Sequence, residues 1–166
     1  GAGEQAVELY HWVNDAVQKG DELEEAAGQM IDRWQNERTK FIPGFGHRFH
    51  KPEDPRTPRL LGLVDEAAQA GTIDGCFAHI GRAIQQTLNT RKGKPVPMNI
   101  DGATAVIYAE LGFAGPLARG LFCLSRSVGI LAHAWEQMNQ NERNKGPTPP
   151  AYRWTYLGPN SIEGSN

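Results

Sequence analysis

The sequence has few of the features that mark secreted, membrane or nucleic-acid-binding proteins. It contains two cysteines, Cys76 and Cys123, and no CxxC pair. Isolated cysteines are most often reduced thiols in a core, so we expect a cytoplasmic protein and no disulfide scaffold. No apolar run approaches the ~20 residues that span a bilayer. Lys and Arg (17) nearly balance Asp and Glu (19), which argues against a nucleic-acid or membrane partner.

What is present indicates a single globular domain with a modest supply of apolar residues. The 166 residues are enough for one domain with a core that needs neither disulfides nor a metal ion. Apolar residues make up 39% of the chain, and the mean hydropathy is -0.52. That share is lean for a self-contained core, and the chain opens on Gly1 rather than on methionine. Both features are expected of a part of a longer protein.

Hydrophobic periodicity predicts an all-α fold. Apolar residues recur at helical spacing over Glu4–Lys19, and Gly20 ends that segment. Asp21 and Glu24 have the spacing of a capping box for a second helix, which runs through Trp34. The sequence shows no alternating strand pattern, and the tail from residue 141 onwards is expected to be extended. Four further helices are expected over Arg59–Gly71, Asp74–Thr90, Asp101–Leu111 and Pro116–Asn139.

The segment from Phe41 to Pro58 is predicted to be a loop rich in cationic side chains. Four prolines and two glycines exclude regular structure there. Gly44 and Gly46 flank Phe45 and allow a ligand to approach the backbone closely. The basic side chains that follow are His47, Arg48, His50, Lys51, Arg56 and Arg59.

This loop supports more than one hypothesis. Its cations can neutralise phosphates or carboxylates, and Arg56 can hold a carboxylate through both arms of its guanidinium group. Spacing alone favours the alternative, a surface loop whose charges are solvated. His47 and His50 lie three residues apart without a neighbouring set of carboxylates or cysteines, so we predict no metal site.

Asp101 lies at the start of an expected helix, in the segment PMNIDGATAVIY. An aspartate at such a position is most often an N-cap, and this is the interpretation that base rates favour. Its neighbours are apolar, however, and a carboxylate in apolar surroundings can act as a general base near neutral pH. Both roles stay open from the residues alone.

A third group of residues lies on one face of the last expected helix. Arg126, Gly129 and His133 are spaced to share that face, and a glycine inside a helix costs about 1 kcal/mol against alanine. The glycine therefore indicates close approach by another backbone or by a ligand. A buried Arg126 needs a partner, which is either a substrate carboxylate or an intramolecular salt bridge beside a core histidine. The accompanying apolar stripe consists of Leu117, Leu121, Leu124, Val128 and Leu131.

Taken together, these segments resemble the citrate synthase family. The matching segments are, in order, GAGEQAV, PGFGHRFHKPEDPR, NIDGATAVIYAELG, RSVGILAHAWEQ and YLG. They cover nearly the whole chain in the order found in that family's small domain and C-terminal helices. The resemblance implies a small helical domain over residues 1–112. Residues 113–166 are then a helix and an extended tail that pack on a large domain outside this sequence.

The resemblance also implies a chemistry and a role for each candidate residue. Family members form or cleave the carbon–carbon bond of citryl-CoA, between acetyl-CoA and a 2-oxo acid such as oxaloacetate, without a permanently bound cofactor. By similarity, Asp101 removes the methyl proton of acetyl-CoA, and His47 hydrogen-bonds or protonates the ketone oxygen of the oxo acid. Arg56 and Arg126 match arginines that bind substrate carboxylates. The positions that match the family's CoA site are Gly44, Phe45, Gly46 and Lys51.

Two features depart from the family pattern. The family's first catalytic histidine would precede Gly1, so residues 1–166 alone are expected to be inactive. Ala151 stands where the family usually has a third carboxylate-binding arginine, five residues before Tyr156. The missing arginine and the tail GPTPPAYRWTYLG favour a citryl-CoA lyase over a citrate synthase.

The quaternary structure and two rival hypotheses complete the expectations. A homodimer is expected by analogy with the family. One rival is a non-catalytic helical interaction module, whose charged loops are merely solvated. The other is a metal site built from His47, His50 and His133.

Overall fold

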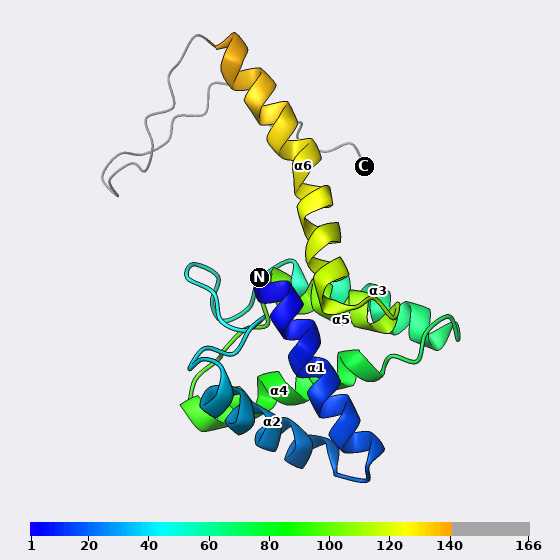
Figure 1. Cartoon of the computed structure of the whole chain (residues 1–166). Helices are drawn as coiled ribbons and strands as arrows, with labels where there is room; N and C mark the ends of the chain where they lie inside the picture. Colours follow the sequence, from blue (N-terminus) through cyan, green and yellow to red (C-terminus); the bar gives the residue numbers. More distant parts are fainter. Residues whose placement is uncertain (141–166) are drawn as a thin grey trace. The chain divides into compact units, whose positions relative to one another are not determined.

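The computed structural model describes residues 1–140, and these fold into helices joined by loops (Figure 1). Within this described part no strand forms, and the β-type pairing is an isolated bridge between Phe45 and Met98. The all-α prediction is confirmed, and each predicted helix is present with ends displaced by at most three residues. The predicted extended tail lies outside the described residues. The helices are α1 (Ala2–Gln18), α2 (Leu23–Glu37), α3 (Thr57–Gln69), α4 (Cys76–Lys92), α5 (Ile100–Glu110) and α6 (Gly115–Asn139).

The chain divides into two compact units, residues 1–127 and residues 128–166. The first unit holds α1 to α5 and has a continuous core in which α1 packs against α2, α4 and α5. Figure 1 shows α1 crossing α4. Leu9, Tyr10 and Val13 of α1 are fully buried because the 3–4 spacing turns them towards the same side of the helix.

The connection between α1 and α2 corrects one prediction. Asp21 and Glu24 do not form a capping box, because α2 begins at Leu23 with Glu22 as its N-cap and no side chain bonds there. Asp21 instead completes the end of α1. The N–H of Gly20, at a φ of 110°, donates to the carbonyl of Val17, and the N–H of Asp21 donates to that of Ala16. This pair of bonds is a Schellman motif, so the residue predicted to begin α2 terminates α1.

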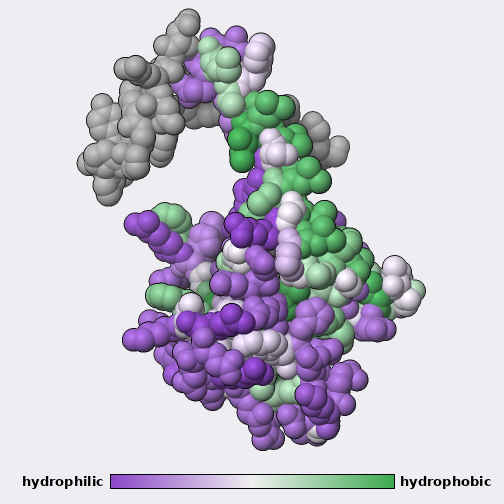
Figure 2. Space-filling view, in the orientation of Figure 1, coloured by the Kyte–Doolittle hydropathy of each residue, from purple (hydrophilic) through white to green (hydrophobic). Residues whose placement is uncertain are grey.

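Helix α6 is exposed along most of its length. Its buried residue in the described part of the chain is Ala118, whereas Val128 and Leu131 are each 72% exposed. Figure 2 shows hydrophobic residues at the surface along α6. Arg126 is exposed as well, and no layer of the described residues packs over its face of α6. No helix of residues 1–140 is long and apolar enough to cross a membrane.

The carboxylate of Glu110 joins α5 to the start of α4. Its Oε1 accepts the N–H groups of Phe77 (2.7 Å) and Ala78 (3.2 Å), and its Oε2 accepts that of Gly75 (3.0 Å). Helix N-termini leave such N–H groups without intrahelical partners and favour a negative charge nearby. Glu110 therefore caps a helix to which it does not belong and fixes α5 relative to α4.

Replacing Glu110 by glutamine tests this tie between the helices. Glu110→Gln keeps the size of the side chain but removes its charge and replaces one accepting oxygen with a donor. We expect the free energy of unfolding to fall by about 1–3 kcal/mol, measured by urea denaturation. Glu66→Gln, on the exposed side of α3, is the matched control and should change it by less than about 0.5 kcal/mol. Equal losses in the two variants would contradict the capping role.

Candidate functional site

The loop that carries His47 is paired with the segment that precedes α5. The N–H of Gly46 donates to the carbonyl of Pro97 (2.7 Å), and the N–H of Asn99 donates to that of Gly44 (2.9 Å). The side-chain amide of Asn99 also donates to the carbonyl of Gly46 (2.8 Å). These bonds hold the loop against the first turn of α5, so the two sequence segments with candidate catalytic residues meet at one place.

Two glycines make this approach possible. Gly44 has a φ of 84°, which side chains disfavour. A Cβ on Gly102 would lie 2.3 Å from the carbonyl oxygen of Gly44, and a Cβ on Gly44 would lie 2.7 Å from the Cα of Gly102. The two backbones are therefore in direct contact, so at Gly44 the close approach is made by α5, whereas the sequence had predicted approach by a ligand.

Asp101 is not the N-cap of α5, which corrects the interpretation that base rates favoured. Asn99 occupies the cap, and its side-chain oxygen accepts the N–H groups of Asp101 (3.0 Å) and Gly102 (3.2 Å). The Asp101 carboxylate is thus not used in capping and lies half-buried in the first helical turn. Its negative charge contributes to the raised pKa of Arg56. The structure therefore brings Asp101 into electrostatic range of a predicted substrate-binding arginine.

The imidazole of His47 has a defined orientation. Its Nδ1 atom accepts the backbone N–H groups of Phe49 (3.0 Å) and His50 (2.9 Å). Because both neighbours are donors, Nδ1 has no proton, and a neutral ring then has its proton on Nε2. His47 is thereby prepared to donate one hydrogen bond through Nε2.

Arg56 is already bound to one carboxylate. Its Nε and Nη2 atoms donate to Oδ1 (2.9 Å) and Oδ2 (2.7 Å) of the fully buried Asp54. This pairing holds the pKa of Asp54 well below its usual range and raises the pKa of Arg56. Among the described residues no hydrogen bond engages Nη1 of Arg56. Asp54 therefore orients the guanidinium group and leaves one arm for a further anion.

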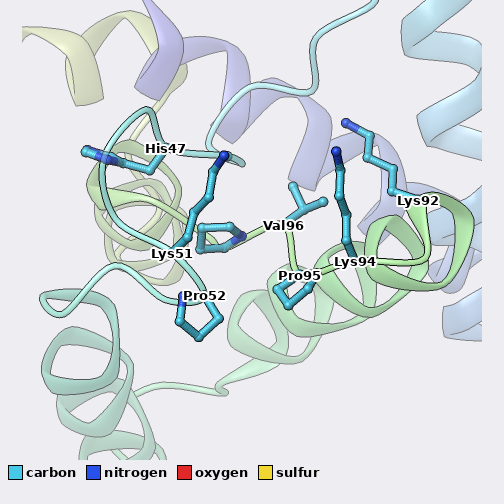
Figure 3. A pocket seen from close by; sticks show the side chains of 9 residues that line it. His47, Lys51, Pro52, Lys92, Lys94, Pro95 and Val96 are labelled. Atoms are coloured by element: carbon cyan, nitrogen blue, oxygen red, sulfur yellow. The ribbon is translucent and has the colours of Figure 1, made fainter.

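A cationic pocket lies beside the His47 loop. It has a volume of about 460 Å³ and is lined by Gly46, His47, Lys51, Pro52, Lys92, Lys94, Pro95, Val96 and Pro97. Figure 3 shows the side chains of Lys51, Lys92 and Lys94 extending to the same side of the pocket, with the ring of His47 beyond Lys51. The walls between them are apolar. Such a site suits a ligand that has both phosphates and an apolar part.

Lys92 and Lys94 are site residues that the sequence reasoning missed. They belong to the segment RKGKPVP, which the sequence identifies only as a loop. Its two lysines and two prolines lie directly before the Asp101 segment, and that proximity was the available signal.

The predicted residues of α6 are found in different surroundings from those expected. Arg126 is exposed, with its guanidinium carbon 4.9 Å from the centre of the Phe122 ring. His133 is 84% exposed and pairs with Glu136 at 3.3 Å, so it is not a core histidine. A Cβ on Gly129 would meet nothing within 4 Å among the described residues, so no close approach occurs there. Residues 1–140 also contain no group of three or more His, Cys, Asp or Glu side chains placed to hold a metal ion.

These features define an all-helical protein, over the described residues, with a cationic pocket near a histidine, a carboxylate and an arginine that is held by an aspartate. Comparison with known proteins gives the family. Residues 1–153 match the model of the citrate synthase C-terminal domain. The chain therefore belongs to the citrate synthase family, as the sequence motifs predicted.

Known relatives share this fold over most of the chain. The citrate synthase of Acidithiobacillus ferridurans is 30% identical over 85% of this chain and 35% of its own length. Citrate synthase 1 of Mycobacterium tuberculosis is 29% identical over 95% of this chain and 35% of its own. Among solved structures, the citryl-CoA lyase of Hydrogenobacter thermophilus has a TM-score of 0.68 and 28% identity, over 98% of this chain and 59% of that one. The chain spans about a third of the length of these curated relatives.

The pairing of the buried Asp54 with the more exposed Arg56 predicts a specific acid sensitivity. Because the pKa of Asp54 is lower in the folded protein than in the unfolded chain, its stabilisation is complete above the ordinary carboxyl pKa of about 4. The stabilisation declines as the pH falls below that value. We expect Asp54→Asn to lower the free energy of unfolding by about 1.5–3 kcal/mol at pH 7, with a smaller difference at pH 3. Urea denaturation at several pH values measures both quantities.

Asp65→Asn is the control for this experiment. Asp65 pairs with Arg82 at 2.6 Å, but its side chain is 54% exposed, so the loss should be below about 1 kcal/mol. An unchanged pH dependence in the Asp54→Asn protein would show that the pair does not cause the acid sensitivity.

Proposed function

We propose that this chain forms the coenzyme A side of an enzyme that makes or breaks the carbon–carbon bond of citryl-CoA. The observation that supports this most is the junction of the His47 loop with the first turn of α5. There the Gly44 carbonyl receives the N–H of Asn99, and Asp101 follows two residues later. A proton donor or hydrogen-bond donor and a carboxylate base are the two groups that this reaction needs.

The proposed mechanism assigns one role to each group. Asp101 removes a methyl proton of acetyl-CoA, and the resulting carbon attacks the ketone carbon of the 2-oxo acid. Negative charge then develops on the ketone oxygen, where a hydrogen bond from Nε2 of His47 stabilises it. Arg56, held by Asp54, binds a carboxylate of the oxo acid through its remaining arm. In the cleavage direction these steps run backwards.

The lysine pocket is the proposed coenzyme A site. Coenzyme A joins negatively charged phosphates to a less polar pantetheine arm, and the pocket combines three lysines with proline and valine walls. Lys51 was assigned to this role by resemblance, and Lys92 and Lys94 extend the assignment. Gly44, Phe45 and Gly46 are proposed to line the path from the pocket to Asp101.

The proposal also covers residues 113–166, which include α6. Arg126 is proposed to bind a second substrate carboxylate, and residues 113–166 to pack on a large domain. The exposed apolar side chains Leu124, Val128 and Leu131 support a packing role for this helix. A homodimer and a cytoplasmic location are part of the same proposal, by analogy with the family.

The direction of the reaction is proposed to be cleavage. Ala151 in place of an arginine supports a lyase, although that position lies outside the described residues. The test is an assay of the full-length protein with citryl-CoA, compared with condensation of acetyl-CoA and several 2-oxo acids. Faster condensation than cleavage would overturn the assignment as a lyase, and absence of both would overturn the proposed function.

Asp101→Asn tests the proposed base. The variant keeps the size of the side chain, and Asn99 still caps α5, so the fold should be intact by circular dichroism. In the full-length protein we expect exchange of the acetyl-CoA methyl protons with deuterated water to fall at least about 100-fold, because the amide cannot take up the proton. Asp74→Asn, an exposed aspartate before α4, should exchange at the wild-type rate. Wild-type exchange in the Asp101→Asn protein would exclude Asp101 as the base.

Lys94→Ala tests the proposed coenzyme A site. Loss of one charged contact to a phosphate should weaken coenzyme A binding about tenfold, measured by calorimetry at low salt. Pantetheine, which lacks the phosphates, should bind the variant and the wild type equally. Lys40→Ala, an exposed lysine next to the same loop, is the control and should not change either affinity. If Lys94→Ala weakened the binding of coenzyme A and of pantetheine equally, Lys94 would not be a contact of the phosphates.

A further inference from the structure

His50 has no role in the proposed reaction, yet it contacts His47 in two ways. Its backbone N–H donates to Nδ1 of His47 at 2.9 Å. Its imidazole ring also lies against that of His47, with ring centres 4.3 Å apart and planes inclined by 33°. Phe49 also donates its N–H to Nδ1 of His47, but the ring of His50 is the one that lies closer to the imidazole.

The other aromatic neighbour cannot replace this contact. The Phe49 ring is 6.2 Å from that of His47 at 57°, and it is 77% exposed. The two backbone N–H groups hold Nδ1 but do not by themselves fix the tilt of the His47 ring about them. The ring of His50 limits that tilt by covering one face of the imidazole.

The surroundings of His50 indicate contact rather than proton transfer. Among the described residues neither ring nitrogen of His50 has a hydrogen bond or an ion pair. The charged group that faces it is Asp54, whose lowered pKa owes a small part to His50. His50 thus contacts the His47 ring and lies within electrostatic range of the carboxylate that orients Arg56.

We propose that His50 is a positioning residue for His47. Its ring holds the His47 imidazole so that Nδ1 faces the loop backbone and Nε2 faces the reacting oxygen. This inference rests on the proposed function for its catalytic consequence, but the orientation of His47 can be measured without any activity. A displacement of about 1 Å at a reacting group can cost up to 100-fold in rate, so the effect is measurable.

Two substitutions separate the ring contact from the chemistry of the second histidine. His50→Ala keeps the backbone N–H and removes the ring, whereas His50→Phe keeps a flat ring and removes both nitrogens. In the full-length protein we expect His50→Ala to lower kcat about tenfold with KM for the CoA substrate unchanged, and His50→Phe to restore at least half of the wild-type kcat. His79→Ala, an exposed histidine of α4, should match the wild type.

Nitrogen NMR of labelled histidine provides the second readout. The wild type and His50→Phe should show the same sharp His47 ring-nitrogen signals with the proton on Nε2. In His50→Ala the two backbone N–H groups still hold Nδ1, but the ring is free to tilt, so its Nε2 signal should shift and broaden. If the full-length protein neither cleaves nor condenses, the proposed function fails and the NMR result alone decides the role of His50. An unchanged His47 signal and unchanged kcat in His50→Ala would overturn the proposal. Equal defects in the alanine and phenylalanine variants would also overturn it, because they would assign the effect to the nitrogens of His50.

Discussion

The site depends on one close backbone contact, that of Gly44 with Gly102. Atoms of a side chain at either position would lie within 2.3–2.7 Å of the opposite backbone, so only two glycines allow the loop to rest on α5. Once it does, Asn99 bonds in three directions. Its backbone N–H and its amide nitrogen hold the carbonyls of Gly44 and Gly46, and its amide oxygen caps α5.

A side chain of α1 also contacts both segments that meet at Gly44 and Gly102. The hydroxyl of the fully buried Tyr10 donates to the carbonyl of Gly102 at 3.2 Å, and its ring meets that of Phe45 edge to face. Burial raises the pKa of Tyr10 far above its usual value, so the hydroxyl keeps the proton that it donates. One α1 side chain therefore touches both the loop and the helix that the glycines join. The separation of His47 from Asp101 is consequently set by the packed core and not by the loop alone.

The sequence predicted the helices and the meeting of the candidate residues through different signals. Hydrophobic spacing is a local property, and it was sufficient for the positions of all six helices. The capping residues were harder to predict from the sequence, because several adjacent polar residues could each occupy the cap position. Asp21 ended α1 instead of beginning α2, and Asn99 rather than Asp101 capped α5. In both cases the predicted capping residue lies one or two positions from the observed N-cap, which is Glu22 for α2 and Asn99 for α5.

Contacts between distant segments could not be predicted from the pattern of residues within any one segment. Asp54 and Arg56 are close in the sequence, so their pairing is a local feature. The burial of Asp54, however, is a result of tertiary packing. Lys92 and Lys94 line the same pocket as Lys51 because the hydrogen bonds of Gly46 and Asn99 hold the two loops together. Resemblance to a family assigned roles to residues within motifs, and it was silent about these two lysines outside them.

Helix α6 holds apolar side chains that the core of residues 1–127 does not bury. Its large apolar residues alternate at spacings of four and three, through Leu117, Leu121, Leu124, Val128, Leu131, Trp135 and Met138. This is the heptad pattern of a helix that packs along its length against other helices. Six of these seven side chains are half or more exposed, so apolar residues that a core would bury are instead at the surface. The core of residues 1–127 therefore uses fewer apolar side chains than the composition suggests.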